Sequence, residues 1–179
     1  RTESFKDQFF KPIRESVVKH MENKIILYYG GTHAMDAAVR GIAAAYALSG
    51  KKVLYTDFSN GGKYHAFTDI DNPKFRLFQP SHPTGQNYAE MTDEKRRFAL
   101  LDNTDYFEAA TNKAAFGGFD LVIFDYLSDA TAFGVLYEGI LTDWLNSRPE
   151  HLDVLATGNF ASAKMAELAD EIYNFTRVK

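Results

Sequence analysis

The chain has 179 residues, of which 45% are apolar and 25% charged, and its formal net charge at pH 7 is −4. These values predict a single soluble domain, and they give no electrostatic reason to expect nucleic acid or an anionic membrane as the main partner. Cysteine is absent, which excludes disulfides, thiolate nucleophiles and thiolate metal sites. No apolar run reaches the length of a membrane span, and we expect a cytoplasmic protein.

The first third of the chain alternates helix and strand patterns. Apolar residues at helical spacing predict an amphipathic helix from Ser4 to Met21. A strand is expected at Ile25–Tyr29, a turn at Gly30-Gly31, a helix from about Met35 to Ser49, and a second strand at Val53–Tyr55. A strand, a glycine turn, a helix and a second strand form the βαβ layout of a phosphate-binding site.

The expected helix after this turn carries mostly small side chains on one face. These residues are Ala34, Ala37, Ala38, Gly41, Ala44, Ala45 and Leu48. Because small side chains allow close packing, we expect this face to lie against the sheet.

The alternation continues to the end of the chain. Strands are expected at Phe75–Phe78, Phe119–Phe124, Leu152–Ala156 and Ile172–Val178; helices at Asp93–Ala115, Val135–Asn146 and Ala161–Ala169; and a loop at Gln79–Tyr88. This pattern predicts a three-layer α/β domain with a mostly parallel central sheet over residues 24–179, preceded by an N-terminal helix over residues 1–23.

Ligands of such sheets sit beyond the carboxyl ends of the strands. The candidate site segments are therefore Gly30–Asp36, Asp125–Asp129 and Thr157–Asn159. Two carboxylates among them have alternative roles. Asp36, in the first turn of a helix, either complements the helix dipole or is a ligand for a metal. Asp125 is either a metal ligand or the cap of a loop.

Two long segments, from Phe119 to Asn159 and from Met165 to Lys179, resemble the ATP:corrinoid adenosyltransferases. The matching motifs are Arg148-Pro149, Thr157-Gly158, Leu168-Ala169-Asp170 and Val178-Lys179, and in the front half Ile25–Gly30, the Ala-rich helix and Gly50–Val53. The resemblance implies a fold like that of the P-loop NTPases, with ATP and Mg²⁺ as cofactors and a reduced corrinoid as substrate. It also implies transfer of the 5′-deoxyadenosyl group of ATP to the cobalt(I) nucleophile, and it suggests a homodimer.

The departures from the family pattern lie at positions that the resemblance assigns to the binding of ATP and Mg²⁺. The family loop resembles Gly-Asn-Gly-Lys-Gly-Lys-Thr-Thr. In this chain the corresponding segment is Gly30-Gly31-Thr32-His33-Ala34-Met35-Asp36-Ala37, in which His33 and Met35 replace the two lysines and Asp36 replaces the hydroxyl that would hold Mg²⁺.

Other departures lie at the ends of later strands and in the middle of the chain. Asp125 stands where the family has a metal-supporting Asp, so it is the candidate Mg²⁺ ligand, but Tyr126 replaces the following Glu. Asn159 replaces the Arg that follows Thr-Gly. For the corrinoid we find Phe78 and His82 as candidate residues, without the expected Trp. His65 and His82 are either metal ligands or ordinary loop histidines.

The absence of the two lysines lowers the affinity that we expect for ATP. A unit charge about 4 Å from a phosphate oxygen contributes roughly 4 kcal/mol at an effective dielectric near 20, so the loss of one lysine lowers affinity on the order of a thousandfold. We therefore expect weakened or lost ATP binding. Three functions stay open: an adenosyltransferase, a non-catalytic relative that binds a corrinoid, another planar ligand or a protein partner, and a different activity on the same scaffold.

Overall fold

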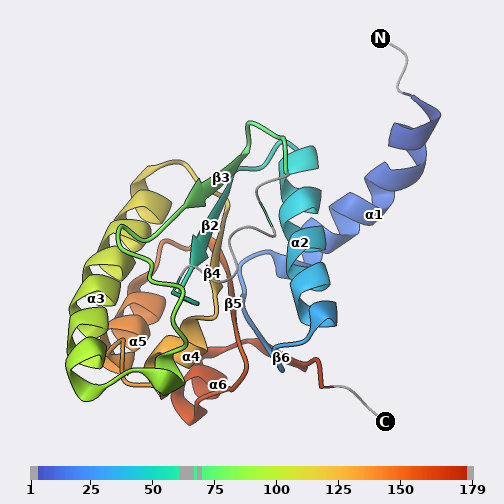
Figure 1. Ribbon diagram of the computed structural model, residues 1–179. Coiled ribbons are helices and arrows are strands. Elements are labelled where there is room, and N and C mark those ends of the chain that lie inside the picture. The colour runs from blue at the N-terminus through green and yellow to red at the C-terminus, as the bar shows by residue number, and fades with distance from the viewer. Residues whose placement is uncertain (1–3, 61–66, 68–69, 177–179) are drawn as a thin grey trace.

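The computed structural model describes residues 4–60, 67 and 70–176, and it has a single parallel sheet at its centre (Figure 1). His65 and the Val178-Lys179 end of the family resemblance lie outside the described residues. The six strands run in the order β3-β2-β4-β5-β1-β6, and every pair is parallel. They are β1 Ile25–Tyr29, β2 Val53–Asp57, β3 Phe75–Phe78, β4 Leu121–Asp125, β5 Asp153–Gly158 and β6 Glu171–Asn174. The predicted α/β class with a parallel central sheet is confirmed.

Helices cover both faces of the sheet. They are α1 Phe5–Met21, α2 His33–Leu48, α3 Asp93–Phe116, α4 Leu127–Ala132, α5 Glu138–Ser147 and α6 Ala163–Leu168, with a 3-10 turn, η2, at Tyr88–Glu90. In Figure 1, α1 and α2 lie on one side of the sheet, and α3, α5 and α6 lie on the other. None of the helices in the described part of the chain is long and apolar enough to cross a membrane.

Each face of the sheet has its own core, because successive side chains of a strand point to opposite faces. On the side of α2, Val53 and Tyr55 pack with Tyr46 in one buried cluster. On the side of α3, Leu54 and Phe124 belong to a second cluster that contains aromatic residues of α3. The two cores give the three layers that the sequence predicts.

The small-residue face of α2 does not lie where the sequence predicts. The buried side of this helix carries larger residues such as Val39, Ile42 and Tyr46. Gly41 is exposed, and a Cβ added to it would meet no atom within 4 Å. Leu48 is also exposed. The prediction was wrong because small side chains fit a solvent-facing position as well as a close contact, whereas large apolar side chains gain more from burial.

The parallel register brings the carboxyl ends of the strands to one edge of the sheet. Asp57 at the end of β2 is the register partner of Asp125 at the end of β4. On the other side of β5, Tyr29 at the end of β1 is the partner of Gly158. The segments that follow β1, β2, β4 and β5 therefore meet, and they form the candidate site.

Candidate functional site

The loop after β1 makes the tight turn that the sequence predicts. Gly30 and Gly31 have φ angles of 124° and 61°, in the region that favours glycine. The backbone N–H of Gly30 donates to the carbonyl of Gly158 over 3.0 Å. Thr32 caps α2 by accepting a hydrogen bond from the backbone N–H of Met35 over 3.2 Å. A tight glycine turn and a capped helix start therefore stand where the sequence predicts them.

The side chains of this loop include no lysine or arginine. Met35 is fully buried in the α2 face of the core, and His33 and Ala34 are exposed. Asn159 approaches the loop so closely that a Cβ on Gly31 would lie 1.6 Å from its Oδ1 atom. A neutral amide thus borders the turn where the family pattern has an arginine.

The Asn159 side chain is held in place by a buried carboxylate. Its backbone N–H donates to Oδ1 of Asp129 over 2.8 Å, and its Nδ2 donates to Oδ2 over 2.5 Å. Burial raises the pKa of Asp129, while these hydrogen bonds act in the opposite direction. The sequence reasoning named Asp129 only as the end of a loop segment. The structure shows that it positions Asn159.

Two of the substituted residues contact one another. The Tyr126 hydroxyl donates to Oδ1 of Asp36 over 3.0 Å, and this hydrogen bond joins the end of β4 to the first turn of α2. Tyr126 has a left-handed backbone, with φ 58° and ψ 24°, a conformation that is uncommon outside glycine, asparagine and aspartate. Burial raises the pKa of the Tyr126 phenol, and the nearby Asp36 carboxylate raises it further. The phenol therefore stays protonated and acts as the donor.

Asp125 lies buried beneath this pair, 1% exposed. Its Oδ2 accepts from the hydroxyl of Tyr55 and its Oδ1 from that of Thr157, each over 2.5 Å. Burial raises the pKa of Asp125 to about 7, although both hydrogen bonds lower it, and the carboxylates of Asp57 and Asp36 raise it further. Asp125 is thus partly protonated near neutral pH.

Asp57, on the neighbouring strand, is a site residue that the sequence analysis missed. Its Oδ1 accepts from the backbone N–H of Ser59 over 2.8 Å, and its Oδ2 is buried without a hydrogen-bond partner among the described residues. The same rule that singles out Asp125, a polar residue at the end of an apolar strand, would have found Asp57.

The carboxylates at the strand ends do not gather into a set of three metal ligands in the part of the chain that the structure describes. Mg²⁺ prefers charged oxygen ligands in octahedral geometry, whereas both oxygens of Asp125 accept hydroxyl hydrogen bonds. Asp125 as a magnesium ligand stays a prediction.

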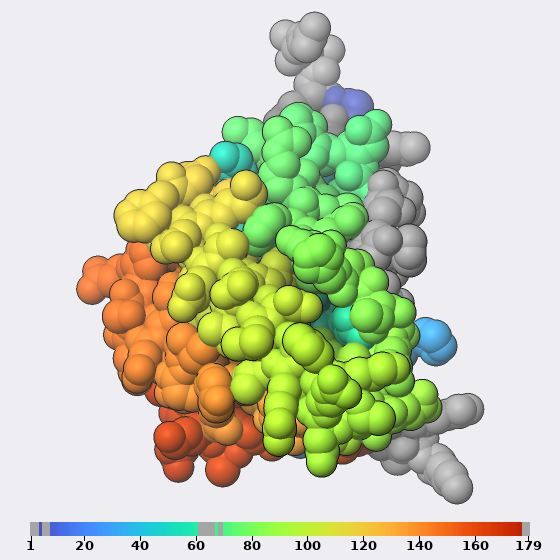
Figure 2. Space-filling model, turned by 60° about the vertical axis from the view of Figure 1, so that its left-hand side comes forward, coloured from blue at the N-terminus to red at the C-terminus, as the bar shows by residue number. Residues whose placement is uncertain are grey.

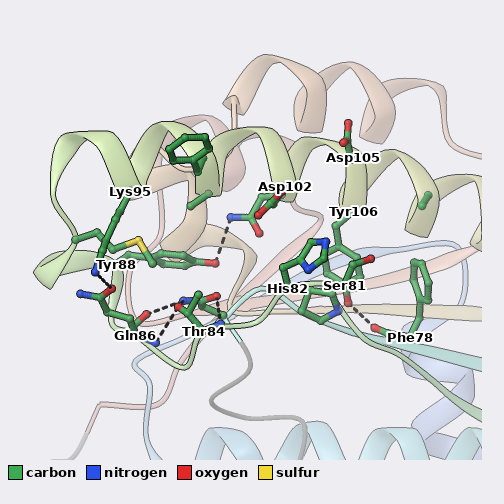
Figure 3. Close-up of a pocket in the computed structure, with 17 residues that line it drawn as sticks. Phe78, Ser81, His82, Thr84, Gln86, Tyr88, Lys95, Asp102, Asp105 and Tyr106 are labelled. Carbon is green, nitrogen blue, oxygen red and sulfur yellow. Dashed lines mark hydrogen bonds between the residues drawn. The ribbon is translucent and has the colours of Figure 1, made fainter.

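A cavity of about 540 Å³ lies beside this edge of the sheet, between α3 and the loop that follows β3 (Figure 3). Both candidate corrinoid residues line it: Phe78 at the end of β3 and His82 in the loop. Figure 2 shows this face of the molecule, where the loop and η2 run alongside α3. Pockets of this size hold small organic molecules or parts of larger ones.

Buried phenols link the cavity to the strand ends. Tyr106 accepts from the backbone N–H of Asp57 over 2.9 Å and donates to the carbonyl of Phe78. Tyr88 donates to the carbonyl of Phe58 over 2.8 Å and accepts from Nδ2 of Asn103 over 3.2 Å. The sequence analysis named none of these contacts, because each joins residues that are far apart in the chain.

Asn60 fastens the loop that covers the cavity. Its Nδ2 donates to Oγ1 of Thr84 over 2.6 Å and to the carbonyl of Gln86 over 2.9 Å, and its Oδ1 accepts from the backbone N–H of Thr84 over 3.1 Å. Its own carbonyl accepts from the N–H of Gly85 over 2.9 Å. Asn60, three positions after the end of β2, thus sets the position of one wall of the cavity.

Comparison with known proteins agrees with this architecture. The family model described as ATP:corrinoid adenosyltransferase BtuR/CobO/CobP matches residues 22–179. No match was found among curated proteins.

Proposed function

Because the chain belongs to the ATP:corrinoid adenosyltransferase family, we propose that it is a divergent member that binds a corrinoid and binds ATP weakly or not at all. In the reaction of the family, cobalt(I) attacks C5′ of ATP, a Co–C bond forms, the C5′–O bond breaks and triphosphate leaves. Cobalt is the nucleophile, so the protein has to position two substrates and stabilise the negative charge of the leaving group.

The hydrogen bond between Tyr126 and Asp36 carries the proposal of weak ATP binding. Its 3.0 Å length places a carboxylate and a phenol together at the first turn of α2, where the family pattern has the hydroxyl that would hold Mg²⁺ and the glutamate that Tyr126 replaces. A carboxylate beside the phosphate turn repels the triphosphate. The backbone donors of the turn remain, but the loop has no lysine or arginine to offset that repulsion.

The cavity beside α3 supports the corrinoid part of the proposal. It is lined by Phe78 and His82 and by Tyr88 and Tyr106. A flat ligand with polar substituents suits such walls, because aromatic rings pack on it while the rim makes hydrogen bonds. We propose Phe78 and His82 as corrinoid contacts.

The second candidate function is that of a non-catalytic protein that binds a corrinoid or a protein partner on the same fold. The contact between Asp36 and Tyr126 favours it, because each of the two residues satisfies the other without a metal or a nucleotide. A transferase and a corrinoid-binding relative both bind the corrinoid and differ in turnover, whereas a relative that binds only a protein partner would not bind the corrinoid.

An anaerobic adenosylation assay with ATP·Mg and reduced cobalamin separates the two. We expect calorimetry to show binding of cobalamin, and a dissociation constant for ATP·Mg of about 1 mM or weaker. Measurable turnover at high ATP would identify a weak transferase, and corrinoid binding without turnover would identify the non-catalytic protein. Micromolar binding of ATP·Mg would contradict the proposed weakening.

Two matched double variants test whether Asp36 and Tyr126 cause the weak binding of ATP·Mg. Asp36→Thr with Tyr126→Glu restores the family residues, and we expect it to strengthen ATP·Mg binding. Asp36→Asn with Tyr126→Phe removes the carboxylate and the phenol without restoring a metal site. If the second pair gains as much Mg²⁺-dependent affinity as the first, the restored side chains are not the cause.

We further propose that the protein is a cytoplasmic homodimer. The apolar residues Phe9 and Ile13 of α1 are 62% and 54% exposed, an exposure that subunit contact would remove. Sedimentation at several concentrations tests this; a monomer throughout would refute it, and Phe9→Ser with Ile13→Ser should weaken the dimer.

A further inference from the structure

The rim of the cavity beside α3 is charged unevenly. Three charged side chains of α3 line it: Lys95 near one end, and Asp102 and Asp105 further along the helix. At about 1.5 Å per residue, Asp102 lies about 10 Å from Lys95 along the axis, beyond the Debye length of about 8 Å at physiological salt. The carboxylate end of the rim therefore keeps its negative potential.

The two ends of the cavity rim also differ in the contacts that their polar side chains make. Nζ of Lys95 donates to Oε1 of Gln86 over 3.2 Å, so the cation is tied to the loop. Figure 3 shows His82 reaching from the loop toward α3, and the Asp105 carboxylate pointing away from that loop. At the other end, Asp102 and Asp105 are, among the described residues, two carboxylates against one cation, Lys113, whose Nζ lies 5.3 Å from the centre of the Phe78 ring.

We propose that this cavity selects corrinoids whose peripheral side chains are amidated over corrinoids that keep free carboxylates. The inference rests on the proposed function. A primary amide donates an N–H group to the carboxylate of Asp102, whereas a ligand carboxylate is repelled by the charges of Asp102 and Asp105. The cavity, of about 540 Å³, takes up one edge of the macrocycle, where these substituents lie.

Binding of two corrinoids tests the selection. Cobinamide, which is amidated, and cobyrinic acid a,c-diamide, which keeps carboxylates, are titrated at pH 8 with the same cobalt oxidation state and axial ligands. One charge pair in contact in water corresponds to about a fivefold change in affinity. We therefore expect wild-type protein to bind cobinamide about fivefold more tightly, or better.

Charge-neutralising variants identify the residues. We expect Asp102→Asn with Asp105→Asn to strengthen binding of the acid about fivefold or more and to change cobinamide binding less than twofold. The single variant Asp102→Asn should give most of this effect. The control Glu108→Gln removes the same charge from α3 outside the cavity and should change neither affinity. Near 1 M salt, where the Debye length is about 3 Å, the wild-type preference should shrink, and this measurement needs no variant.

The outcomes are distinct. Equal binding of both corrinoids, or equal shifts for both in the double variant, would overturn the selection and leave the proposed function standing. Binding of neither corrinoid would overturn the proposed function and the selection together.

Discussion

Tyr126 and Asp36 are joined by a 3.0 Å hydrogen bond across 90 residues of sequence. The family pattern has a hydroxyl at the position of Asp36 and a glutamate at that of Tyr126, and the two residues of this chain contact each other directly. A tyrosine with a left-handed backbone costs roughly 1 to 2 kcal/mol, so the surrounding structure has to hold it there. The backbone N–H of Tyr126 does so by donating to Oγ1 of Thr157 over 2.9 Å.

A double-mutant cycle measures this contact. We expect Tyr126→Phe, Asp36→Ala and the double variant to show a coupling free energy of about 1 kcal/mol, because a hydrogen bond to a charged group is stabilising but Asp36 is only half-buried. The measurement is the free energy of unfolding in urea. The matched control is Tyr137→Phe, since Tyr137 is 63% exposed, and its change should stay within about 0.5 kcal/mol. A coupling near zero would show that the two residues are neighbours without mutual stabilisation.

The raised pKa of Asp125 predicts a pH dependence of stability. Its folded-state pKa of about 7 lies above the ordinary aspartate value of 3.8, so between these values the folded state binds more protons than the unfolded state. Stability attributable to Asp125 therefore falls as the pH rises from about 4 to 7, by a few kcal/mol at most. Urea unfolding at pH 5 and pH 8 should show this loss in the wild type and a smaller loss in Asp125→Asn.

Other buried carboxyl groups also have raised pKa values, so the comparison between variants decides whether Asp125 causes the pH dependence of stability. Burial also raises the pKa values of Asp129 and Asp153, and their contributions remain in Asp125→Asn. The exposed Asp143 of α5 provides the control, and Asp143→Asn should keep the full pH dependence. If Asp125→Asn loses as much stability as the wild type between pH 5 and pH 8, the carboxyl of Asp125 is ionised throughout.

Much of the fold could be predicted because buried parallel strands are continuous apolar runs. The segments around Leu121–Asp125 and Asp153–Gly158 are fully buried, and their hydrophobicity carries that information locally. Helix α4 was missed because its six residues, Leu127–Ala132, are too few to show a period. The predicted face of α2 was wrong because alanine and glycine do not specify burial.

The site could be predicted in outline, and its contacts could not. The strand-end rule brought together the three loop segments that meet in the structure. Sequence spacing does not show that Asn159 lies against Gly31, or that Asn60 holds a loop more than twenty residues away. Such contacts depend on the register of the whole sheet, which no local pattern encodes.

Asn60 offers a test of how the cavity is held. We expect Asn60→Gly to loosen the loop over residues 79–87, because it removes three side-chain hydrogen bonds while permitting the left-handed φ of 61°. Faster amide exchange and proteolysis in that loop are the measurements. The matched control is Asn23→Gly, since Asn23 has nearly the same φ, 60°, and lies outside the cavity. Equal exchange in both variants would mean that the prolines of the loop fix it without Asn60.

Gly158 is required by close packing at the end of β5. A Cβ on this residue would lie 1.7 Å from Oγ of Ser128 and 3.0 Å from Oδ1 of Asp129, and all three residues are buried. We expect Gly158→Ala to lower the free energy of unfolding by about 1 to 3 kcal/mol, because overpacking forces neighbouring atoms to move. The control is Gly139→Ala in α5, where an added Cβ meets no atom within 4 Å and helix propensity favours alanine. Urea unfolding of both variants measures the difference. Equal stability of the two would show that Ser128 rotates away at little cost, and that the contact between α4 and β5 is looser than this packing implies.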